Sequence, residues 1–358
     1  MVRSYDVGSL PLPDGLKLED FSALAESYNA WKYFYPDRYA PFRDAVIKGY
    51  LDKQKWVDIP NYPQFRDMNE MFRSMINGVE KINGAYVFTD VPSIPASAAT
   101  IPEVSVIMEE AGRIYEEVGE KFRMKVCITG PYTLSYPFGD STGYACSTIG
   151  GLLKAVVKSN IFDEKRGKVE LVVFDEPLLG LINDSRLDNG SPWRDGILKS
   201  LEDLLQVAKA KGAETGLHLH STSVDVMGLN NLDVIESHFD DPFYQTENTK
   251  RLLEKHEKWT KLPITYTQYD KLISTDNPEL VAAVWKKIKK KEIDPAMYLE
   301  PWETMSLRLE KLGKMFGERG KYAGGECGLL SFPTYDCAME SLRRQSLAIA
   351  DYNSKALG

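Results

Sequence analysis

The stretch VELVVFDEP, residues 169–177, decides the class of fold. Five of its first six residues are apolar, and the carboxylates Asp175 and Glu176 follow with a proline behind them. Such a run is typical of a strand in a parallel sheet that is covered on both faces. The stretch therefore predicts an α/β protein with polar side chains where this strand ends.

Seven further runs are short and rich in apolar, β-branched or aromatic residues: SYDVGS (4–9), AYVFTD (85–90), MKVCITG (124–130), GLHLH (216–220), LDVIES (232–237), ITYTQYD (264–270) and KYAGGE (321–326). Amphipathic stretches such as residues 104–122, with apolar residues three and four apart, lie between them and predict helices. Eight strands alternating with helices predict a (β/α)8 TIM barrel, whose chemistry sits at the carboxyl ends of its strands. We expect one barrel domain over residues 1–358, with an N-terminal helical elaboration.

The composition excludes several classes of partner. The 358 residues include 44 Lys plus Arg against 52 Asp plus Glu, which gives a net charge of −8. An acidic chain is not expected to bind nucleic acid or an anionic membrane, because both need a basic surface. No stretch approaches the roughly 20 apolar residues of a membrane span, and the N-terminus lacks the apolar core of a signal peptide. We therefore expect a cytoplasmic protein.

The chain has only four histidines and four cysteines, and the positions of several of them suggest a metal site. His218 and His220 alternate along one predicted strand and so face the same space. His238 follows the next strand, and Cys327 follows the last. Imidazole and thiolate are ligands that zinc prefers, and a catalytic zinc site has three protein ligands and one open position. His220, His238 and Cys327 supply that number, although each could also be an ordinary buried side chain.

Two further places predict binding of a small molecule. Asp175 and Glu176 suit an ammonium or hydroxyl partner, the alternative being an ion pair with a neighbouring Lys or Arg. Gly8 and Ser9 offer a backbone amide and a hydroxyl of the kind that hold a carboxylate. Each pattern alone is compatible with a purely structural role.

Taken in order, these segments resemble the catalytic barrel of cobalamin-independent methionine synthase, in a superfamily shared with uroporphyrinogen decarboxylase and the methylcobalamin:coenzyme M methyltransferases. The resemblance rests on VGSLP (7–11), ITGPYTL (128–134), VVFDEP (172–177), GLHLHST (216–222), LDVIES (232–237) and GGECGLLSFPTYDCAMESL (324–342). It spans almost the whole chain and corresponds to the short, single-barrel version of that family.

The resemblance implies a zinc-dependent methyltransferase that moves a methyl group from a corrinoid or folate-type carrier to a small thiol, homocysteine or a related one. It places zinc ligands at His220 and Cys327 and substrate contacts at Gly8, Ser9 and Asp175. The donor would be methylcobalamin or a methyl-folate, and a corrinoid protein is a candidate partner.

The chain departs from the family pattern in both halves of the site. Thr222 stands where the family has a cysteine ligand, and His238, with Glu236 two residues earlier, stands near the glutamate ligand. Pro63 or Gln64 replaces a glutamate that holds the amino group of homocysteine in the family. The acceptor thiol is therefore left open.

Two rival hypotheses remain. One is a metal-independent, decarboxylase-like lyase on the same barrel, with Asp175, Glu176 and His220 as acid and base groups. The other is a non-catalytic homologue that binds a corrinoid or another tetrapyrrole, for which the aromatic residues of the first eighty positions could form a platform.

Overall fold

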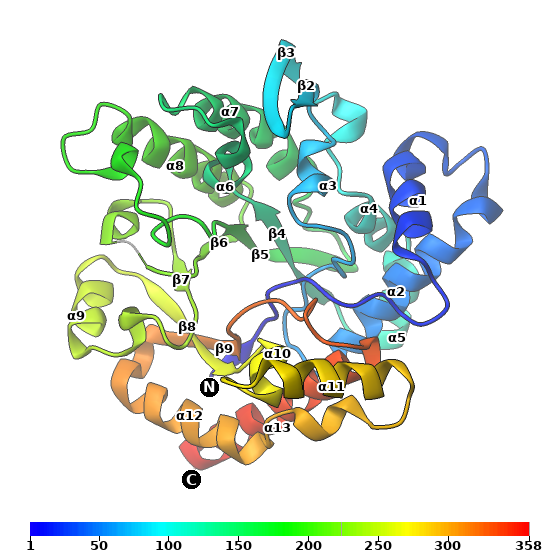
Figure 1. Ribbon diagram of the computed structural model, residues 1–358, viewed down its shortest axis with the longest axis vertical. Helices are drawn as coiled ribbons and strands as arrows, with labels where there is room; N and C mark the ends of the chain where they lie inside the picture. Colours follow the sequence, from blue (N-terminus) through cyan, green and yellow to red (C-terminus); the bar gives the residue numbers. More distant parts are fainter. Residues whose placement is uncertain (223, 358) are drawn as a thin grey trace.

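Seven parallel strands form a curled sheet in the computed structural model, which describes residues 1–222 and 224–357 (Figure 1). The strand order is β1-β9-β8-β7-β6-β5-β4, and neighbouring strands pair in parallel throughout. Their bounds are β1 (Arg3–Ser4), β4 (Phe122–Thr129), β5 (Gly167–Asp175), β6 (Glu214–His218), β7 (Val234–Glu236), β8 (Trp259–Thr265) and β9 (Gly320–Gly325). Because the strands are parallel, their carboxyl ends meet on one side of the sheet.

Helices surround this sheet (Figure 1). The longer ones are α1 (Leu18–Trp31), α2 (Ala40–Gln54), α4 (Pro102–Glu109), α5 (Ala111–Val118), α7 (Tyr144–Ser159), α8 (Arg194–Ala210), α9 (Glu247–Lys255), α11 (Pro278–Lys289), α12 (Trp302–Phe316) and α13 (Tyr335–Leu357). Three short ones are α3 (Glu70–Arg73), α6 (Pro131–Ser135) and α10 (Tyr269–Ile273). None of the helices in the described part of the chain combines the length and apolar character needed to span a membrane.

One predicted barrel strand is wrong. Residues 85–90 belong to β3 (Ala85–Ser93), which pairs antiparallel with β2 (Asn77–Ile82) in a hairpin outside the parallel sheet (Figure 1). Asn83 and Gly84 form the turn with φ values of 51° and 88°. Asn-Gly is the strongest short signal for a two-residue hairpin turn, because both residues tolerate positive φ. That dipeptide was the clue that residues 85–90 pair locally.

The segment 59–64 lies between β1 and β4 instead. Isolated parallel bridges join Ile59 to Tyr5 and Asn61 to Lys125. Proline has no backbone N–H, so the two prolines of this segment limit it to isolated bridges and made it unrecognisable as a strand.

A second boundary also differs. Residues 264–270 were expected to form one strand ending at Asp270, but β8 ends at Thr265 and Asp270 lies in α10. The carboxyl end of this strand is therefore five residues earlier than the sequence suggested.

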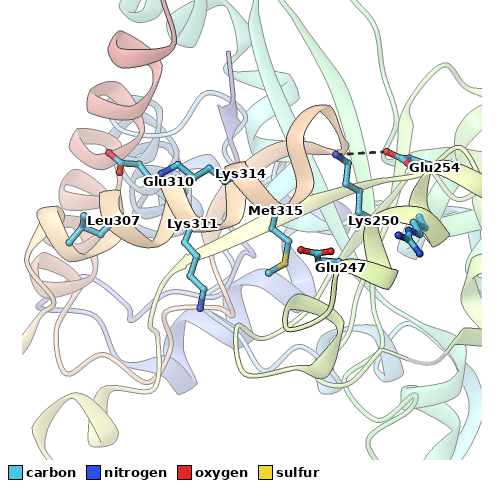
Figure 2. A pocket seen from close by; sticks show the side chains of 9 residues that line it. Glu247, Lys250, Glu254, Leu307, Glu310, Lys311, Lys314 and Met315 are labelled. Atoms are coloured by element: carbon cyan, nitrogen blue, oxygen red, sulfur yellow. Dashed lines mark ion pairs between the residues drawn. The ribbon is translucent and has the colours of Figure 1, made fainter.

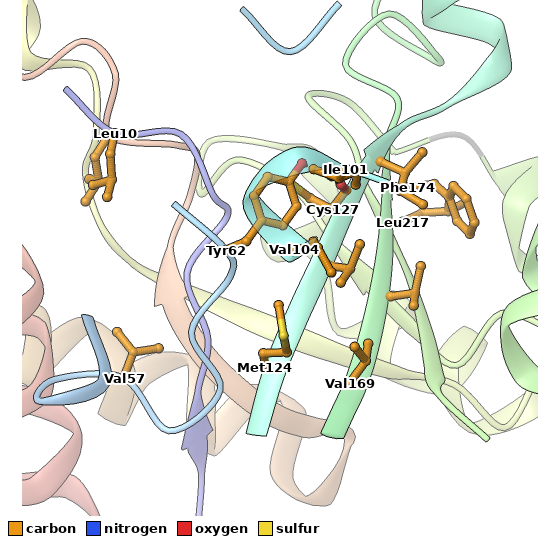
Figure 3. Packing of buried hydrophobic residues seen from close by; sticks show 14 of the residues in the cluster. Leu10, Val57, Tyr62, Ile101, Val104, Met124, Cys127, Val169, Phe174 and Leu217 are labelled. Atoms are coloured by element: carbon orange, nitrogen blue, oxygen red, sulfur yellow. Dashed lines mark hydrogen bonds between the residues drawn. The ribbon is translucent and has the colours of Figure 1, made fainter. Parts of the chain in front are cut away.

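A continuous apolar core holds β4, β5 and the surrounding helices together (Figure 3). Met124 of β4, Val169 of β5 and Val104 of α4 are all buried in it. The ring of Tyr62 enters the same core, and its hydroxyl donates a hydrogen bond of 3.0 Å to the carbonyl oxygen of Cys127. This contact ties the segment 59–64 to β4.

Candidate metal centre

Three histidines and one cysteine converge at the carboxyl ends of β6, β7 and β9. His218 is the last residue of β6, and His220 follows two positions later; His238 and Cys327 each lie two positions beyond the end of β7 and β9. One nitrogen or sulfur atom from each of the four residues lies within 4.8 Å of the others. The three residues predicted as metal ligands are thus brought together, and His218 joins them.

The spacing suits a tetrahedral zinc ion. With bonds of about 2.0–2.3 Å, two ligand atoms of such a site are about 3.3–3.8 Å apart. The Cys327 Sγ and His220 Nε2 atoms are 3.7 Å apart. Both ring nitrogens of His218 and Nε2 of His238 are buried and have no hydrogen-bond partner among the described residues. Buried donors without partners are costly unless something else binds them, so this group fits a metal ion.

The protonation states of the histidines also fit. Burial and the neighbouring His238 ring lower the pKa of His220 to about 4. Burial lowers the pKa of His218 well below its ordinary value, and it lowers the pKa of His238 as well. All three imidazoles are therefore neutral near pH 7, the form that binds a metal. Burial raises the pKa of the Cys327 thiol to about 12, so a bound cation would be needed to keep that sulfur ionised.

Thr222, at the altered cysteine position, and Glu236, two residues before His238, have other partners here. The backbone N–H and the hydroxyl of Thr222 both donate to Asp241 Oδ2, each at 2.7 Å. Glu236 forms an ion pair with Lys261 of β8, and its other oxygen lies 3.6 Å from His218 Nδ1. Glu236 is not among the four residues whose donor atoms converge.

The adjacent carboxylates Asp175 and Glu176 have different surroundings. Glu176 is fully buried and accepts hydrogen bonds from the backbone N–H groups of Tyr132 and Thr133 at 2.9 and 2.7 Å, and from the Thr133 hydroxyl at 2.6 Å. Glu176 thereby provides acceptors for two backbone N–H groups in the first turn of α6. A Cβ atom on Gly130 would lie 2.1 Å from Glu176 Oε1, which explains the glycine at that position.

Asp175, in contrast, ends β5 with an Oδ1 atom that has no hydrogen-bond partner in the described structure. Burial raises its pKa to about 7, although the nearby Lys125 ammonium lowers it. Of the two carboxylates, Asp175 is the one whose oxygen is free for a ligand.

Gly8 and Ser9 lie beside the loop that carries Cys327. The backbone N–H of Leu329 donates to the Ser9 carbonyl oxygen at 2.8 Å, and a Cβ atom on Gly328 would lie only 2.0 Å from Ser9 Oγ. Gly8 has a φ of +146°, and a Cβ there would lie 2.8 Å from a side-chain nitrogen of Asn61. A larger residue at position 8 would therefore displace Asn61, and one at position 328 would displace Ser9.

Gln64 stands next to Ser9, with which it forms an isolated parallel bridge. Its side chain is buried, and Nε2 donates weakly to the Tyr62 hydroxyl at 3.4 Å. Nε2 also donates to Met71 Sδ at 3.3 Å, and the Cys127 thiol donates to Oε1 at 3.7 Å. Gln64, one of the two candidates for the glutamate position, is thus neutral and engaged with the residues around it.

A separate surface groove of about 760 Å³ lies between α9 and α12 (Figure 2). Its lining mixes Lys and Arg with Glu: Glu247, Lys250, Arg251, Glu254, Leu307, Glu310, Lys311, Lys314 and Met315. None of the converging His or Cys residues is in this lining, so the groove is not part of the candidate metal centre.

Fold and site together define an α/β protein with a curled parallel sheet and a group of side chains that could hold a metal ion at the carboxyl ends of its strands. Among solved structures, the chain is similar to a B12-independent methionine synthase from Shewanella sp. W3-18-1, in complex with selenomethionine, with a TM-score of 0.64 and 18% identity over 100% of this chain and 99% of that one. It is also similar to a methyltransferase from Methanosarcina mazei, with a TM-score of 0.50 and 12% identity over 97% and 94% of the two chains. No family model and no curated protein matches the sequence. These structures confirm the resemblance to the methionine synthase barrel as a resemblance of fold.

Proposed function

We propose that this protein is a zinc-dependent methyltransferase that moves a methyl group from a corrinoid or folate-type carrier to a small thiol. The observation that carries the proposal is the convergence of His218, His220, His238 and Cys327 at the strand ends of this fold. We further infer that the segment 59–64 takes the place of the remaining strand of a closed barrel, because it bridges to both β1 and β4.

Zinc held by His220, His238 and Cys327 would bind the acceptor thiol and lower its pKa, so that the thiol is present as thiolate. In the reaction the sulfur forms a bond to the methyl carbon, the carrier keeps the electron pair of the broken bond, and the thiol proton is lost to solvent. Ser9 and Gly8, beside the Cys327 loop, would hold the rest of the acceptor, and Asp175 would accept a hydrogen bond from it.

The acceptor itself is homocysteine or a related thiol. An amino group on the acceptor could contact the carboxylate of Asp175, but position 64 is a glutamine and offers no second carboxylate. Thiols without an amino group should therefore be tested as acceptors as well. The methyl donor is methylcobalamin, free or on a corrinoid protein, or a methyl-folate.

Metal analysis and methyl transfer test this proposal. Protein purified without chelator should hold one zinc per chain, and Cys327→Ala should lower that amount. The same protein should transfer methyl from methylcobalamin or methyl-folate to at least one thiol of a panel that includes homocysteine. Zinc far below one per chain, with no change on Cys327→Ala, would refute the metal centre.

A metal-independent lyase is the second candidate. It is favoured by the pKa of about 7 that burial gives Asp175, since an acid or base with a pKa near the working pH is most effective. Decarboxylation or another lyase activity that survives complete removal of metal, and that Asp175→Asn abolishes, would favour this alternative.

A further inference from the structure

The pair Lys261 and Glu236 lies directly behind the converging donors. Lys261 and Glu236 have side chains that are only 1% and 2% exposed, and they are in ion-pair contact across the neighbouring strands β8 and β7. The Lys261 ammonium also lies over the ring of Tyr5, 4.6 Å from its centroid. A buried carboxylate is costly without such a partner, so the contact with Lys261 fixes the Glu236 side chain in place.

Only one oxygen of Glu236 is used in that pair. Its Oε1 atom has no hydrogen-bond partner in the described part of the chain, and it faces Nδ1 of His218 at 3.6 Å. His218 is itself buried, and its ring centroid lies 5.4 Å from that of His220 and 6.2 Å from that of His238. One ring nitrogen of His218 is thus directed to a carboxylate while the ring stands beside the other donors.

We propose that Glu236, fixed by Lys261, is a positioning residue that orients His218 as a fourth metal ligand. By accepting a hydrogen bond from the Nδ1–H group of His218, Glu236 would select the tautomer in which Nε2 of His218 is free to bind the ion. Carboxylates behind metal-bound histidines act in this manner and increase the basicity of the ligand. The proposal rests on the metal centre of the proposed function and adds to it a ligand and its support.

The arrangement also accounts for the altered residues. Thr222, at the position of the altered cysteine ligand, is engaged with Asp241, whereas His238 stands near the position of the glutamate ligand and converges with the other donors. His218 would compensate for the lost cysteine ligand. Before the acceptor binds, the site would then contain three imidazoles and one thiolate, and the acceptor thiol would bind in place of His218, at the position that His220, His238 and Cys327 leave open.

Zinc affinity of the metal-stripped protein tests the proposal by competition with a chromophoric chelator. Glu236→Gln keeps the shape of the side chain and removes its charge, and we expect it to weaken zinc binding about 10- to 100-fold, as loss of a carboxylate behind a histidine ligand does. His218→Ala should weaken binding at least as much. Because Glu236 acts through His218, Glu236→Gln should have no further effect beyond about twofold when His218 is already alanine.

Glu103→Gln is the matched control. Glu103 is also a fully buried glutamate paired with a cation, Arg66, at 2.7–2.8 Å, but it is outside the site. It should leave zinc affinity unchanged even where it lowers stability.

Proton NMR of the zinc-loaded protein provides a second readout that needs no double variant. The Nδ1 proton of His218 should resonate far downfield, be absent in His218→Ala, and move upfield in Glu236→Gln. Two outcomes would overturn the positioning role and leave the metal centre intact. In the first, the wild type binds zinc and Glu236→Gln binds it with the same affinity. In the second, Glu236→Gln lowers zinc affinity by the same factor whether residue 218 is histidine or alanine. A wild type that binds no zinc would overturn both the positioning role and the metal centre.

Discussion

Replacing Glu176 by glutamine tests whether this carboxylate serves the fold rather than the substrate. Three donors from Tyr132 and Thr133 converge on its two oxygens. Glutamine has one acceptor oxygen and an NH2 group, so in either orientation one backbone N–H of α6 faces another donor. A buried donor left without an acceptor costs about 1–3 kcal/mol, and we expect Glu176→Gln to lower the free energy of unfolding by that amount at pH 5.5.

The effect should depend on pH. Burial raises the pKa of Glu176 from 4.5 to about 7, although the hydrogen bonds from Thr133 and Tyr132 lower it. A carboxyl with a raised pKa in the folded state contributes stability that is present below pH 4.5 and is lost as pH rises through about 7. Since glutamine does not titrate, the difference between wild type and Glu176→Gln should narrow from pH 5.5 to pH 8.

Urea unfolding of metal-free protein at both pH values measures these differences, with Asp175→Asn as the matched control. Asp175 Oδ1 has no partner in the described structure, and burial raises its pKa to about 7 as well. Asp175→Asn should therefore change stability little at pH 5.5 and increase it at pH 8. The reasoning is refuted if Glu176→Gln leaves unfolding unchanged at pH 5.5 and instead weakens binding of the acceptor thiol.

Three further perturbations address the substrate position, the interior and the metal. Gly328→Ala would place a Cβ 2.0 Å from Ser9 Oγ; it should displace Ser9 and raise the KM for the thiol with zinc content unchanged, which steady-state kinetics and metal analysis would detect. Lys53→Met would leave Asp6 buried without its ion-pair partner at 2.5 Å; denaturant unfolding should show a loss of about 3–5 kcal/mol. Zinc at a thousand times its dissociation constant should stabilise the chain by about 4 kcal/mol; Cys327→Ser should reduce this gain, as thermal unfolding with and without zinc would show.

Most of the parallel sheet could be predicted from the sequence because its central strands are buried on both faces. The runs that became β4 and β5 are mostly apolar, and none of the strands β4, β5 and β9 contains a proline. The segment 59–64 could not be found in this way. Its prolines remove backbone donors, and only contacts with residues far away in the chain, Tyr5 and Lys125, reveal its place.

The candidate ligands were predictable for a different reason. Alternation along the predicted strand placed His218 and His220 on one side, and the parallel direction of the strands brought His238 and Cys327 to the same edge of the sheet. The partners of Glu236 were not predictable, because no local pattern indicates that Lys261, 25 residues away, turns inward to meet it. Pairing between strands is decided by side-chain packing rather than by spacing in the sequence.

The departures from the family's zinc ligands all make the set of metal-binding side chains less negative. The ligands implied by the family resemblance, one imidazole, two thiolates and one carboxylate, carry a charge of −3, whereas three imidazoles and Cys327 carry −1. A less negative donor set neutralises a bound cation less, so a thiol at that cation ionises at lower pH. Nucleophilicity falls as the pKa of a thiol falls, and the acceptor sulfur would therefore be more fully ionised but less reactive. Such a site would favour a carrier that releases its methyl group readily, which is a reason to test methylcobalamin before a methyl-folate.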